Sequence, residues 1–385
     1  MRRVYCDANA TTPLAPEVLE AMRPHLMEDF GNASSIHFEG QRARKAVDRA
    51  RETLAGFFHC REAEVVFNSG GTEGDNTAIF GLVRAGDHLI TTAIEHSAVL
   101  RAAERVAERG AEVTLVAPRA NGLINPEEIR RALRPATRQT NSTRLISVML
   151  ANNETGVLQP VEEIGKIAVE AGAFLHIDAV QGAGKVEFDV RRFGCHLCSI
   201  SAHKIHGPKG VGAMYVRRGT PLEPLIVGGS HERRQRAGTE NVPGIVGLGK
   251  AVELAMECVA DGTVERIAAL RDRLEAGVLR IAGSGVNGAG APRVANTTNI
   301  RFEQVEGEAL VIALDLKGVA VSGGSACHSG STEPSHVLMA MGLDKNAARA
   351  SLRFSLLRTA TEEDVEHVLR VVPEAVEHLR ALAPA

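Results

Sequence analysis

Short apolar runs alternate with stretches of helical period through the first half of the chain. The apolar runs, rich in β-branched residues, predict strands at 64–67, 88–94, 111–117, 144–150 and 174–180. Amphipathic helices are predicted between them, at 72–85, 96–110 and 160–172. Strands and helices in alternation predict an α/β fold with a mainly parallel central sheet covered by helices on both faces.

The pattern changes in the second half of the chain. Two further apolar runs at 196–201 and 211–216 are followed by a glycine-rich stretch, VGGSHERRQRAGTEN, and by a long helical tract. Shorter strands and helices then lead to a closing helix at 361–382. We therefore predict a large domain of residues 15–255 and a smaller α/β domain made of residues 1–14 and 256–385, with the long helices as the hinge.

Composition and charge argue against several classes of partner. The 385 residues carry a formal charge of −3, and Lys and Arg are scattered among acids, so no basic face for nucleic acid or anionic lipid is predicted. No segment approaches the roughly 18 apolar residues of a membrane span, and the amino-terminal stretch has no signal-peptide core. We expect a cytoplasmic protein whose six widely spread cysteines are reduced thiols.

The stretch FNSGGTEGDN, at 67–76, predicts a turn from a strand into a helix. Gly70 and Gly71 let backbone amides converge before the helix, and Thr72 can cap it. Such a helix start binds anions, although a glycine-rich turn without a ligand fits the same residues. The turn is neither G-x-G-x-x-G nor a Walker A sequence, so it does not indicate a dinucleotide or an NTP.

Two further motifs supply an acid and an amine. Asp178 ends an apolar strand in HIDAVQGAGK, and Lys204 lies between two histidines in SISAHKIHGPKG. The carboxyl ends of strands are where α/β sheets bind ligands. An anion cradle, a carboxylate for a pyridine nitrogen and an amine for a Schiff base are the three groups that pyridoxal phosphate requires.

With these motifs the chain resembles the group I cysteine desulfurases of the NifS/IscS type, which are class V aminotransferase-like enzymes of pyridoxal-phosphate fold type I. The resemblance covers nearly the whole chain in order, through VYCDANATTP, FGNASSIH, FNSGGTEGDN, IEHSAVL, ANNETGVLQP, HIDAVQGAGK, SAHKIHGPKGVGAMYV, RAGTEN, SGGSACHSGSTEPSHVL and SLRFSLL. It implies a homodimer that uses pyridoxal 5′-phosphate to take sulfur from L-cysteine, leaving L-alanine and a persulfide on Cys327. The sulfur would then pass to an acceptor protein, such as a scaffold for iron–sulfur cluster assembly, or to thio-modification.

The resemblance also implies the catalytic residues. Lys204 would form the Schiff base with the cofactor and act as the base at the substrate Cα. His96 would stack on the cofactor ring and move protons. Cys327, on a loop of glycines and serines, would supply the thiolate that attacks the substrate sulfur. Its proton is better accepted by His96 than by the adjacent His328, which need not face the same way.

The remaining contacts to cofactor and substrate follow from the same resemblance. Asp178 would pair with the pyridine nitrogen of the cofactor, and Arg353 would clamp the substrate carboxylate as a bidentate donor. Asn153 and Asn32 would line the substrate side. Further cofactor contacts would come from Gly71, Thr72, Asn153, Gln181, Ser201 and His203, with Thr239 arriving from the other subunit.

Other interpretations stay open at this level. A selenocysteine lyase or another class V enzyme would share the cofactor residues without needing Cys327. A non-catalytic relative could bind a partner or a metal through its thiols. Cys195 and Cys198 have the spacing of half a zinc site, but no second pair follows, so we predict buried thiols and no metal site.

Departures from the family pattern bear on the packing near Arg353 and on the partner. Leu357 stands where the family commonly has glycine, close to Arg353 in the sequence. The chain also lacks the longer carboxyl tail with which many relatives dock their scaffold. The identity of the sulfur acceptor is therefore left open.

Overall fold

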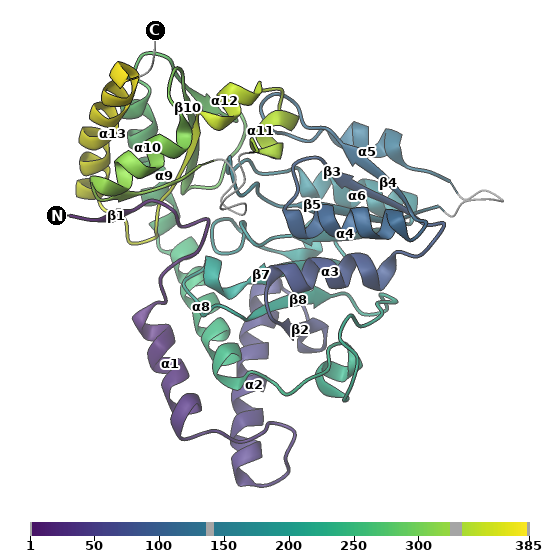
Figure 1. Ribbon diagram of the computed structural model, residues 1–385. Helices are drawn as coiled ribbons and strands as arrows, with labels where there is room; N and C mark the ends of the chain where they lie inside the picture. The colour runs from purple at the N-terminus through teal and green to yellow at the C-terminus, as the bar shows by residue number, and fades with distance from the viewer. Residues whose placement is uncertain (1, 136–141, 324–332, 383–385) are drawn as a thin grey trace.

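The computed structural model describes residues 2–135, 142–323 and 333–382, and these form two adjacent α/β units (Figure 1). The larger unit is built on a seven-stranded sheet, whose strands are β2 (Val65–Asn68), β3 (His88–Thr92), β4 (Glu112–Val116), β5 (Thr143–Met149), β6 (Phe174–Asp178), β7 (Leu197–Ser201) and β8 (Gly212–Val216). Its helices are α1 (Pro16–Met27), α2 (Phe38–Phe58), α3 (Gly71–Leu82), α4 (Ser97–Glu108), α5 (Pro126–Ala132), α6 (Val161–Ala171), α7 (Val190–Phe193) and α8 (Val242–Ala260). Short 3-10 turns lie at η1 (Glu62–Glu64), η2 (Ala202–Lys204) and η3 (His231–Arg234).

The smaller unit contains a four-stranded sheet and a two-stranded one. Its strands are β1 (Val4–Tyr5), β9 (Ser284–Asn287), β10 (Thr297–Phe302), β11 (Val319–Ala320), β12 (Ser322–Gly323) and β13 (Ser351–Ser355). Its helices are α9 (Thr263–Val278), α10 (Gly307–Leu316), α11 (His336–Ala340), α12 (Lys345–Arg349) and α13 (Glu362–Leu382).

The large sheet has the strand order β2-β8-β7-β6-β5-β3-β4. The strands from β4 through β7 run parallel, while β8 is antiparallel to both β7 and β2. The predicted α/β class is confirmed, and each of the predicted strands is present within a few residues of its expected bounds. The sheet is mixed because β7 returns through a short loop into β8, which leaves no room for the helix that a parallel connection needs.

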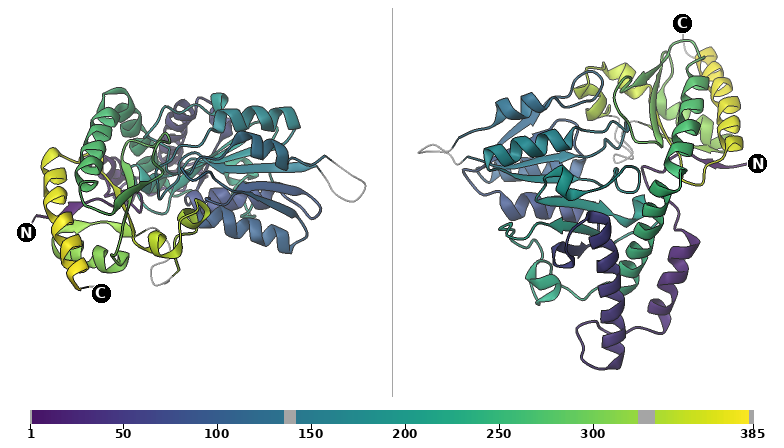
Figure 2. Two further views of the ribbon diagram at one scale, coloured as in Figure 1. Left: turned by 90° about the horizontal axis from the view of Figure 1, so that it is seen from above. Right: turned by 180° about the vertical axis from the view of Figure 1, so that it is seen from behind.

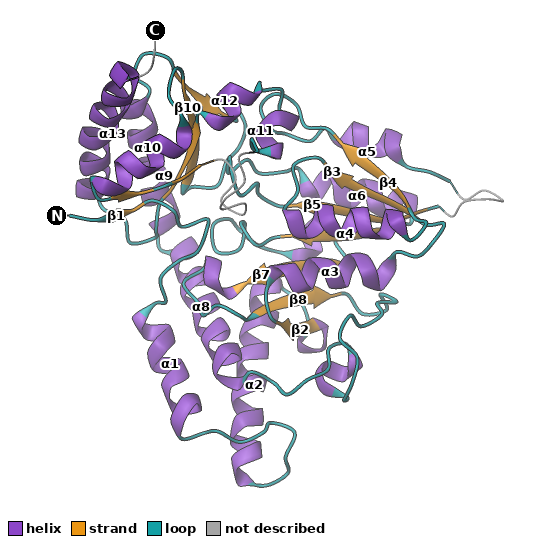
Figure 3. Cartoon of the chain, in the orientation of Figure 1, coloured by secondary structure: helices purple, strands orange, loops and turns teal. Residues whose placement is uncertain are grey.

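Helices cover both faces of this sheet, as the strand patterns predict (Figures 2 and 3). Adjacent residues of one strand point to opposite faces. Leu145 packs in a cluster with α3 and α4, and its neighbour Ile146 packs in the larger cluster with α2, α6 and α8. Because both faces are buried, the strands read as continuous apolar runs.

The smaller unit has its own core, and the amino-terminal segment belongs to it. Val4 and Cys6 pack with residues of α9, β10, α10, β13 and α13. Strand β1 pairs in parallel with β11 through Val4 and Val319. The packing of α11 and α12 is different, since Val337 and Ala348 join the cluster of the large sheet. The domain boundaries after residues 14 and 255 stay a prediction.

No helix in the described parts of the chain is long and apolar enough to span a membrane.

Candidate active site

A cavity of about 270 Å³ lies between the two units, at the carboxyl ends of the parallel strands. Residues from the amino-terminal segment, the large sheet and β13 line it together. Most of the predicted cofactor and substrate residues are among them, namely Gly71, Thr72, His96, Asn153, Asp178, Gln181, Ser201, His203, Lys204 and Arg353. The structure therefore brings together residues that lie far apart in the sequence. Gly71 and Arg353, for example, are separated by 282 positions.

The start of α3 forms one end of the cavity. Gly70 precedes the helix with φ 144°, a backbone conformation that favours glycine, and it provides no side-chain cap to the first amides. A Cβ on Gly71 would come within 2.5 Å of Val180 Cγ2, and one on Gly70 would lie 3.4 Å from Ser201 Oγ. The uncapped amides thus face a narrow space beside a hydroxyl, which suits a phosphate group.

His203 lies close to this end as a neutral ring. Its Nδ1 is 3.1 Å from Thr11 Oγ1. Burial, together with the charges of Lys204 and Lys209, lowers the pKa of His203 to about 4. At neutral pH the ring therefore offers hydrogen bonds without adding a positive charge.

The floor of the cavity holds a pair of buried acids. Asp178 ends β6 and accepts a hydrogen bond from the Val180 amide at 2.9 Å. Burial raises the pKa of Asp178, while the Val180 hydrogen bond and the positive charge of Lys204 oppose the rise. Burial raises the pKa of Asp75 well above its usual range, and the charge of Asp178 adds to it. Because the charge of Lys204 lowers the pKa of Asp178 and not that of Asp75, Asp178 is the acid of the pair that carries the negative charge.

Behind these acids lies a neutral hydrogen-bond chain. His176 is fully buried, and burial lowers its pKa to about 3. Its two ring nitrogens contact Ser147 Oγ at 2.9 Å and Ser199 Oγ at 3.0 Å. Its Nε2 also lies 3.5 Å from Asp75 Oδ1. The second acid is thus supported by polar groups that carry no charge.

Lys204 follows β7 in the turn η2 and reaches across to the amino-terminal segment. Its Nζ donates hydrogen bonds to the carbonyl oxygens of Asn9 at 2.6 Å and Ala10 at 2.8 Å. The turn is itself fixed to this segment, since Thr12 donates through both its amide and its hydroxyl to the His203 carbonyl. The amine is thereby held at the wall of the cavity.

His96 caps α4 and has a defined tautomer. Its Nδ1 accepts a hydrogen bond from the Ala98 amide at 3.1 Å, so the neutral ring carries its proton on Nε2. The adjacent Glu95 is buried, and its Oε1 accepts from Thr92 Oγ1 and the Met149 amide. Burial raises the pKa of Glu95 to about 8.

Arg353, in the middle of β13, lies at the boundary of the two units. It is 1% exposed, and its guanidinium donates to the Asn153 carbonyl at 3.0 Å and to Asp7 Oδ1 at 2.7 Å. Its Nε has no hydrogen-bond partner among the described residues. A buried N–H of this kind, on an arginine that lines a cavity, suits an anionic ligand such as a carboxylate.

Two predicted site residues do not line this cavity, and a third is not described. Asn32 lies on the exposed connection between α1 and α2, where its Oδ1 accepts from the Ser34 amide. Thr239 is exposed beyond η3. Cys327 lies outside the described residues. The roles predicted for these three residues stay predictions.

The structure also adds residues that the sequence reasoning did not assign. Asn9 and Asp75 both line the cavity. Asp75 lies four residues after Gly71, on the same face of α3. This helical spacing could have indicated from the sequence that Asp75 lies near the site. Asn9 belongs to the quoted motif VYCDANATTP, but nothing in the sequence indicates which of its residues turns toward Lys204.

The other cysteines are mostly inert. Cys195 and Cys198 are fully buried, and burial raises the pKa of Cys198 well above its usual range. Burial likewise raises the pKa values of Cys6 and Cys60 to about 12. In the described ranges, no three His, Cys, Asp or Glu residues group as metal ligands.

Comparison with known proteins identifies the family. The family described as Aminotransferase class-V matches residues 4–368. The chain belongs to this family. Within this family, the chain is 47% identical over 387 residues to the cysteine desulfurase IscS of Methanosarcina thermophila. The alignment covers 100% of this chain and 94% of that protein.

Solved structures in the family have the same fold. A NifS-like protein matches with a TM-score of 0.88 and 35% identity, over 98% of this chain and 100% of that one. A structure described as SspA in complex with cysteine matches with a TM-score of 0.80 and 36% identity, over 92% of this chain and 98% of that one. The predicted class V, fold type I architecture and the relationship to cysteine desulfurases are confirmed.

The residues present fit pyridoxal phosphate, the cofactor of this family. The uncapped start of α3 accommodates the phosphate, buried Asp178 provides a carboxylate for a protonated pyridine nitrogen, and Lys204 provides the amine. The Nε of Arg353, which lines the same cavity, has no hydrogen-bond partner among the described residues. Each group that the cofactor requires is therefore met by a residue of the same cavity.

Proposed function

We propose that the protein is a cysteine desulfurase, which converts L-cysteine and a protein thiol into L-alanine and a protein persulfide. The observation that carries the proposal is the convergence of Asp178, Lys204 and Arg353 on one cavity. In the overall step the carbon–sulfur bond of cysteine breaks and a sulfur–sulfur bond to Cys327 forms. The thiol proton and the substrate proton remain with the products, so no external oxidant or reductant is needed.

The cofactor would be held at three points. Gly71, Thr72, Ser201 and His203 would bind its phosphate at the start of α3. Asp178 would keep its pyridine nitrogen protonated, supported by the raised pKa of the neighbouring Asp75. When bound, pyridoxal phosphate supplies the electron withdrawal that stabilises negative charge at the substrate Cα.

Proton movements would be divided between Lys204 and His96. Lys204 would leave the Asn9 and Ala10 carbonyls, bind the cofactor, and act as the base at the substrate Cα once substrate displaces it. His96 carries its proton on Nε2 because Nδ1 is engaged by the Ala98 amide. His96 would first donate the proton on Nε2. The same nitrogen would then accept the proton of the Cys327 thiol.

Arg353 and Asn153 would orient the substrate. The Arg353 Nε would donate to the carboxylate of L-cysteine, while its other nitrogens stay on Asp7 and the Asn153 carbonyl. These contacts fix the Arg353 guanidinium before the substrate arrives. The side chain therefore loses little conformational freedom when the substrate binds.

Both described ends of the segment that carries Cys327 adjoin the cavity. Strand β12 pairs with β13 so that Ser322 lies opposite Arg353. On the other side, His336 Nε2 contacts the Glu95 carbonyl at 2.9 Å, next to His96. These anchors support the proposal that the Cys327 thiol serves this cavity and carries the persulfide away.

Dimerisation and delivery are the less direct parts of the proposal. We propose a homodimer in which Thr239, exposed and outside the cavity of its own chain, contacts the phosphate in the other subunit. Large apolar side chains are exposed around the connection from α1 to α2, including Met27, Phe30, Ile36 and Phe38. The sulfur acceptor would be a protein, as for an iron–sulfur scaffold, in the cytoplasm.

Alanine and sulfide release from L-cysteine, compared between wild type and Cys327→Ala, tests the function. The wild-type holoenzyme should be yellow from its Schiff base and should release alanine, with sulfide appearing when a reductant is added. Cys327→Ala should keep the color but transfer no persulfide sulfur. A colorless wild type would reject the proposal, and full turnover by Cys327→Ala would favour a selenocysteine lyase or another class V activity.

A further inference from the structure

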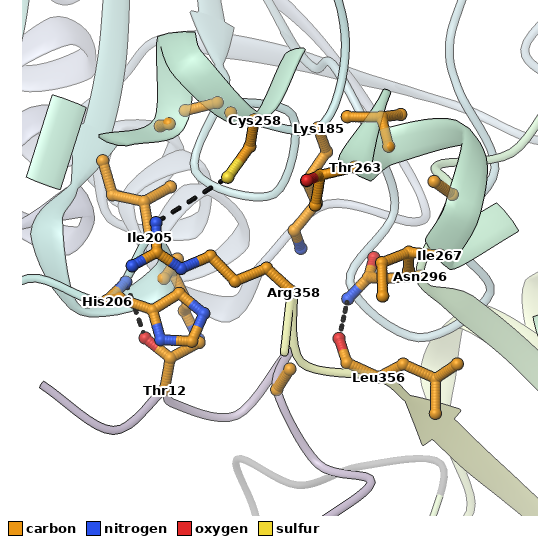
Figure 4. A pocket seen from close by; sticks show the side chains of 17 residues that line it. Thr12, Lys185, Ile205, His206, Cys258, Thr263, Ile267, Asn296, Leu356 and Arg358 are labelled. Carbon is orange, nitrogen blue, oxygen red and sulfur yellow. Dashed lines mark hydrogen bonds between the residues drawn. The ribbon is translucent and has the colours of Figure 1, made fainter. Parts of the chain in front are cut away.

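Lys185 is a polar side chain of the protein interior that the proposed chemistry does not use. It follows β6 by seven residues and lines a second, smaller cavity of about 70 Å³, shown in Figure 4. Lys204 lines both cavities, whereas Lys185 lines the smaller one and not the candidate active-site cavity. Arg358 and His206 also line the smaller cavity. The basic residues of this cavity do not explain why a lysine lies at position 185.

The Lys185 ammonium binds the oxygens of two side-chain amides. Its Nζ donates to Gln181 Oε1 at 2.8 Å and to Asn9 Oδ1 at 3.0 Å. An ammonium group donates hydrogen bonds and cannot accept one. The oxygen of each amide must therefore face Lys185, and the nitrogen of each must point elsewhere.

This orientation decides what Gln181 offers to the cofactor space. Its Nε2 donates one hydrogen to the Asn9 carbonyl at 2.9 Å. The second hydrogen on Nε2 has no acceptor among the described residues, and Gln181 lines the active-site cavity. With Oε1 held by Lys185, the group presented to a ligand is an N–H donor.

The orientation of Asn9 matters for the opposite wall. Its Oδ1 accepts from Lys185 and from Asn296 Nδ2, while its Nδ2 donates to the Asn153 carbonyl at 3.1 Å and to Thr297 Oγ1 at 2.9 Å. The Asn9 backbone carbonyl accepts from Lys204. Asn9 thus connects, through its backbone and its side chain, the segments that carry the catalytic amine and the substrate side of the cavity.

We propose that Lys185 is a positioning residue, which fixes the amides of Gln181 and Asn9 so that Gln181 presents an N–H to the ring oxygen of the cofactor. The inference rests on the proposed function. Lys185 acts through these amides and does not touch the reacting atoms.

Keeping a lysine in this place is unfavourable by itself. Burial, together with the charges of Lys204 and Arg353, which face it from η2 and β13, lowers the pKa of Lys185 to about 7. An apolar residue of the same length would avoid this cost. An apolar residue, however, could not donate hydrogen bonds to the amide oxygens of Gln181 and Asn9.

The test uses the pH titration of the Schiff-base absorption in the holoenzyme. Lys185→Met should raise the titration midpoint by about one pH unit, because a ring oxygen that loses a donor holds the Schiff-base proton more strongly. The dissociation constant of the cofactor, measured with the apoprotein, should rise about threefold to tenfold. Lys166→Met, at an exposed position on α6, should leave both values unchanged.

A double-mutant cycle separates positioning from the loss of a charge. In a Gln181→Ala background, Lys185→Met should shift the midpoint by less than half of its single-variant effect. An equal shift in both backgrounds would mean that the charge acts through space and would overturn the proposal. Where Lys185→Met does not fold, Lys185→Gln, which keeps N–H donors but can also accept, should give a smaller shift of the same sign, and no shift would overturn it.

These outcomes also separate the inference from the proposed function. A wild-type protein without Schiff-base absorption would reject the function itself. A normal absorption in the wild type that Lys185→Met leaves unchanged, in midpoint and in cofactor affinity, would reject only the role of Lys185.

Discussion

At the residue scale, the cavity is organised by which buried groups are charged. Burial raises the pKa values of Asp178, Asp75 and Glu95, and of the three only Asp178 has the rise opposed by the charge of Lys204. The sequence motifs predict Asp178 and Lys204 as a functional pair. They do not predict the states of Asp75 and Glu95, because a pKa depends on neighbours that only the folded chain brings together.

Glu95 gives stability a particular pH dependence. A buried acid with a raised pKa binds its proton more strongly in the native state, so its contribution is complete below about pH 4.5 and is lost as pH rises toward 8. Relative to wild type, Glu95→Gln should therefore gain about 3 kcal/mol of unfolding free energy between pH 5 and pH 8. Denaturant unfolding at several pH values measures this gain. The control is Glu108→Gln, at an exposed position on α4. The unfolding free energy of this variant should change with pH as that of wild type does.

Arg353 should affect substrate binding more than cofactor binding. A lysine at this position keeps the charge but cannot hold Asp7, the Asn153 carbonyl and a carboxylate together in one plane. Arg353→Lys should raise KM for L-cysteine roughly tenfold to a hundredfold, while the Schiff-base absorption is retained. Steady-state kinetics measure the effect, and an unchanged KM would show that the carboxylate is bound elsewhere.

At the scale of elements, the strands were predictable and the connections were not. Apolar runs such as Val65–Asn68 fix the existence of strands because both faces of the sheet are buried. The reversal of β8 and the backbone of η3 depend on tertiary contacts. In η3, Glu232, Arg233 and Arg234 have φ values of 45°, 55° and 68°, a left-handed run of non-glycine residues that no local propensity favours.

A buried ion pair holds this strained segment in place. Glu232 accepts hydrogen bonds from both terminal nitrogens of Arg51, at 2.8 and 2.6 Å, and from the Phe67 amide at 3.0 Å. Glu232→Gln should lower the unfolding free energy by about 3 kcal/mol, because Arg51 keeps its charge in a buried place. Glu253→Gln, which removes an exposed pair with Lys250, is the matched control and should cost under about 1 kcal/mol. Equal losses in the two variants would contradict the structural role of Glu232.

At the scale of the whole molecule, the site exists because two units meet. Motif order along the chain predicts that these residues belong to one site, and most of them line one cavity. Asn32 and Thr239 lie outside the cavity, and their side chains are exposed. The sequence motifs do not predict this, because they do not indicate where each motif lies in the folded chain.

The exposed apolar side chains between α1 and α2 should be part of the dimer interface. Ile36 is 94% exposed and Phe38 is 70% exposed, and the burial of such residues against a second copy would favour association. Ile36→Asp combined with Phe38→Asp should shift the protein toward monomer in sedimentation velocity at micromolar concentration. Cofactor release should become faster, because Thr239 would no longer reach the partner cavity. A monomeric wild type would contradict the prediction.

The amino-terminal segment has a consequence for biosynthesis. Residues 4–9 bond to the backbone or side chains of residues 318–320 and 355, and the carbonyl oxygens of Asn9 and Ala10 hold the amine of Lys204. This segment can therefore reach its final position only after residue 355 has been synthesised. The large sheet can fold earlier, but the cavity is complete only once these contacts have formed. A nascent chain would thus be shielded from premature loading with a reactive aldehyde.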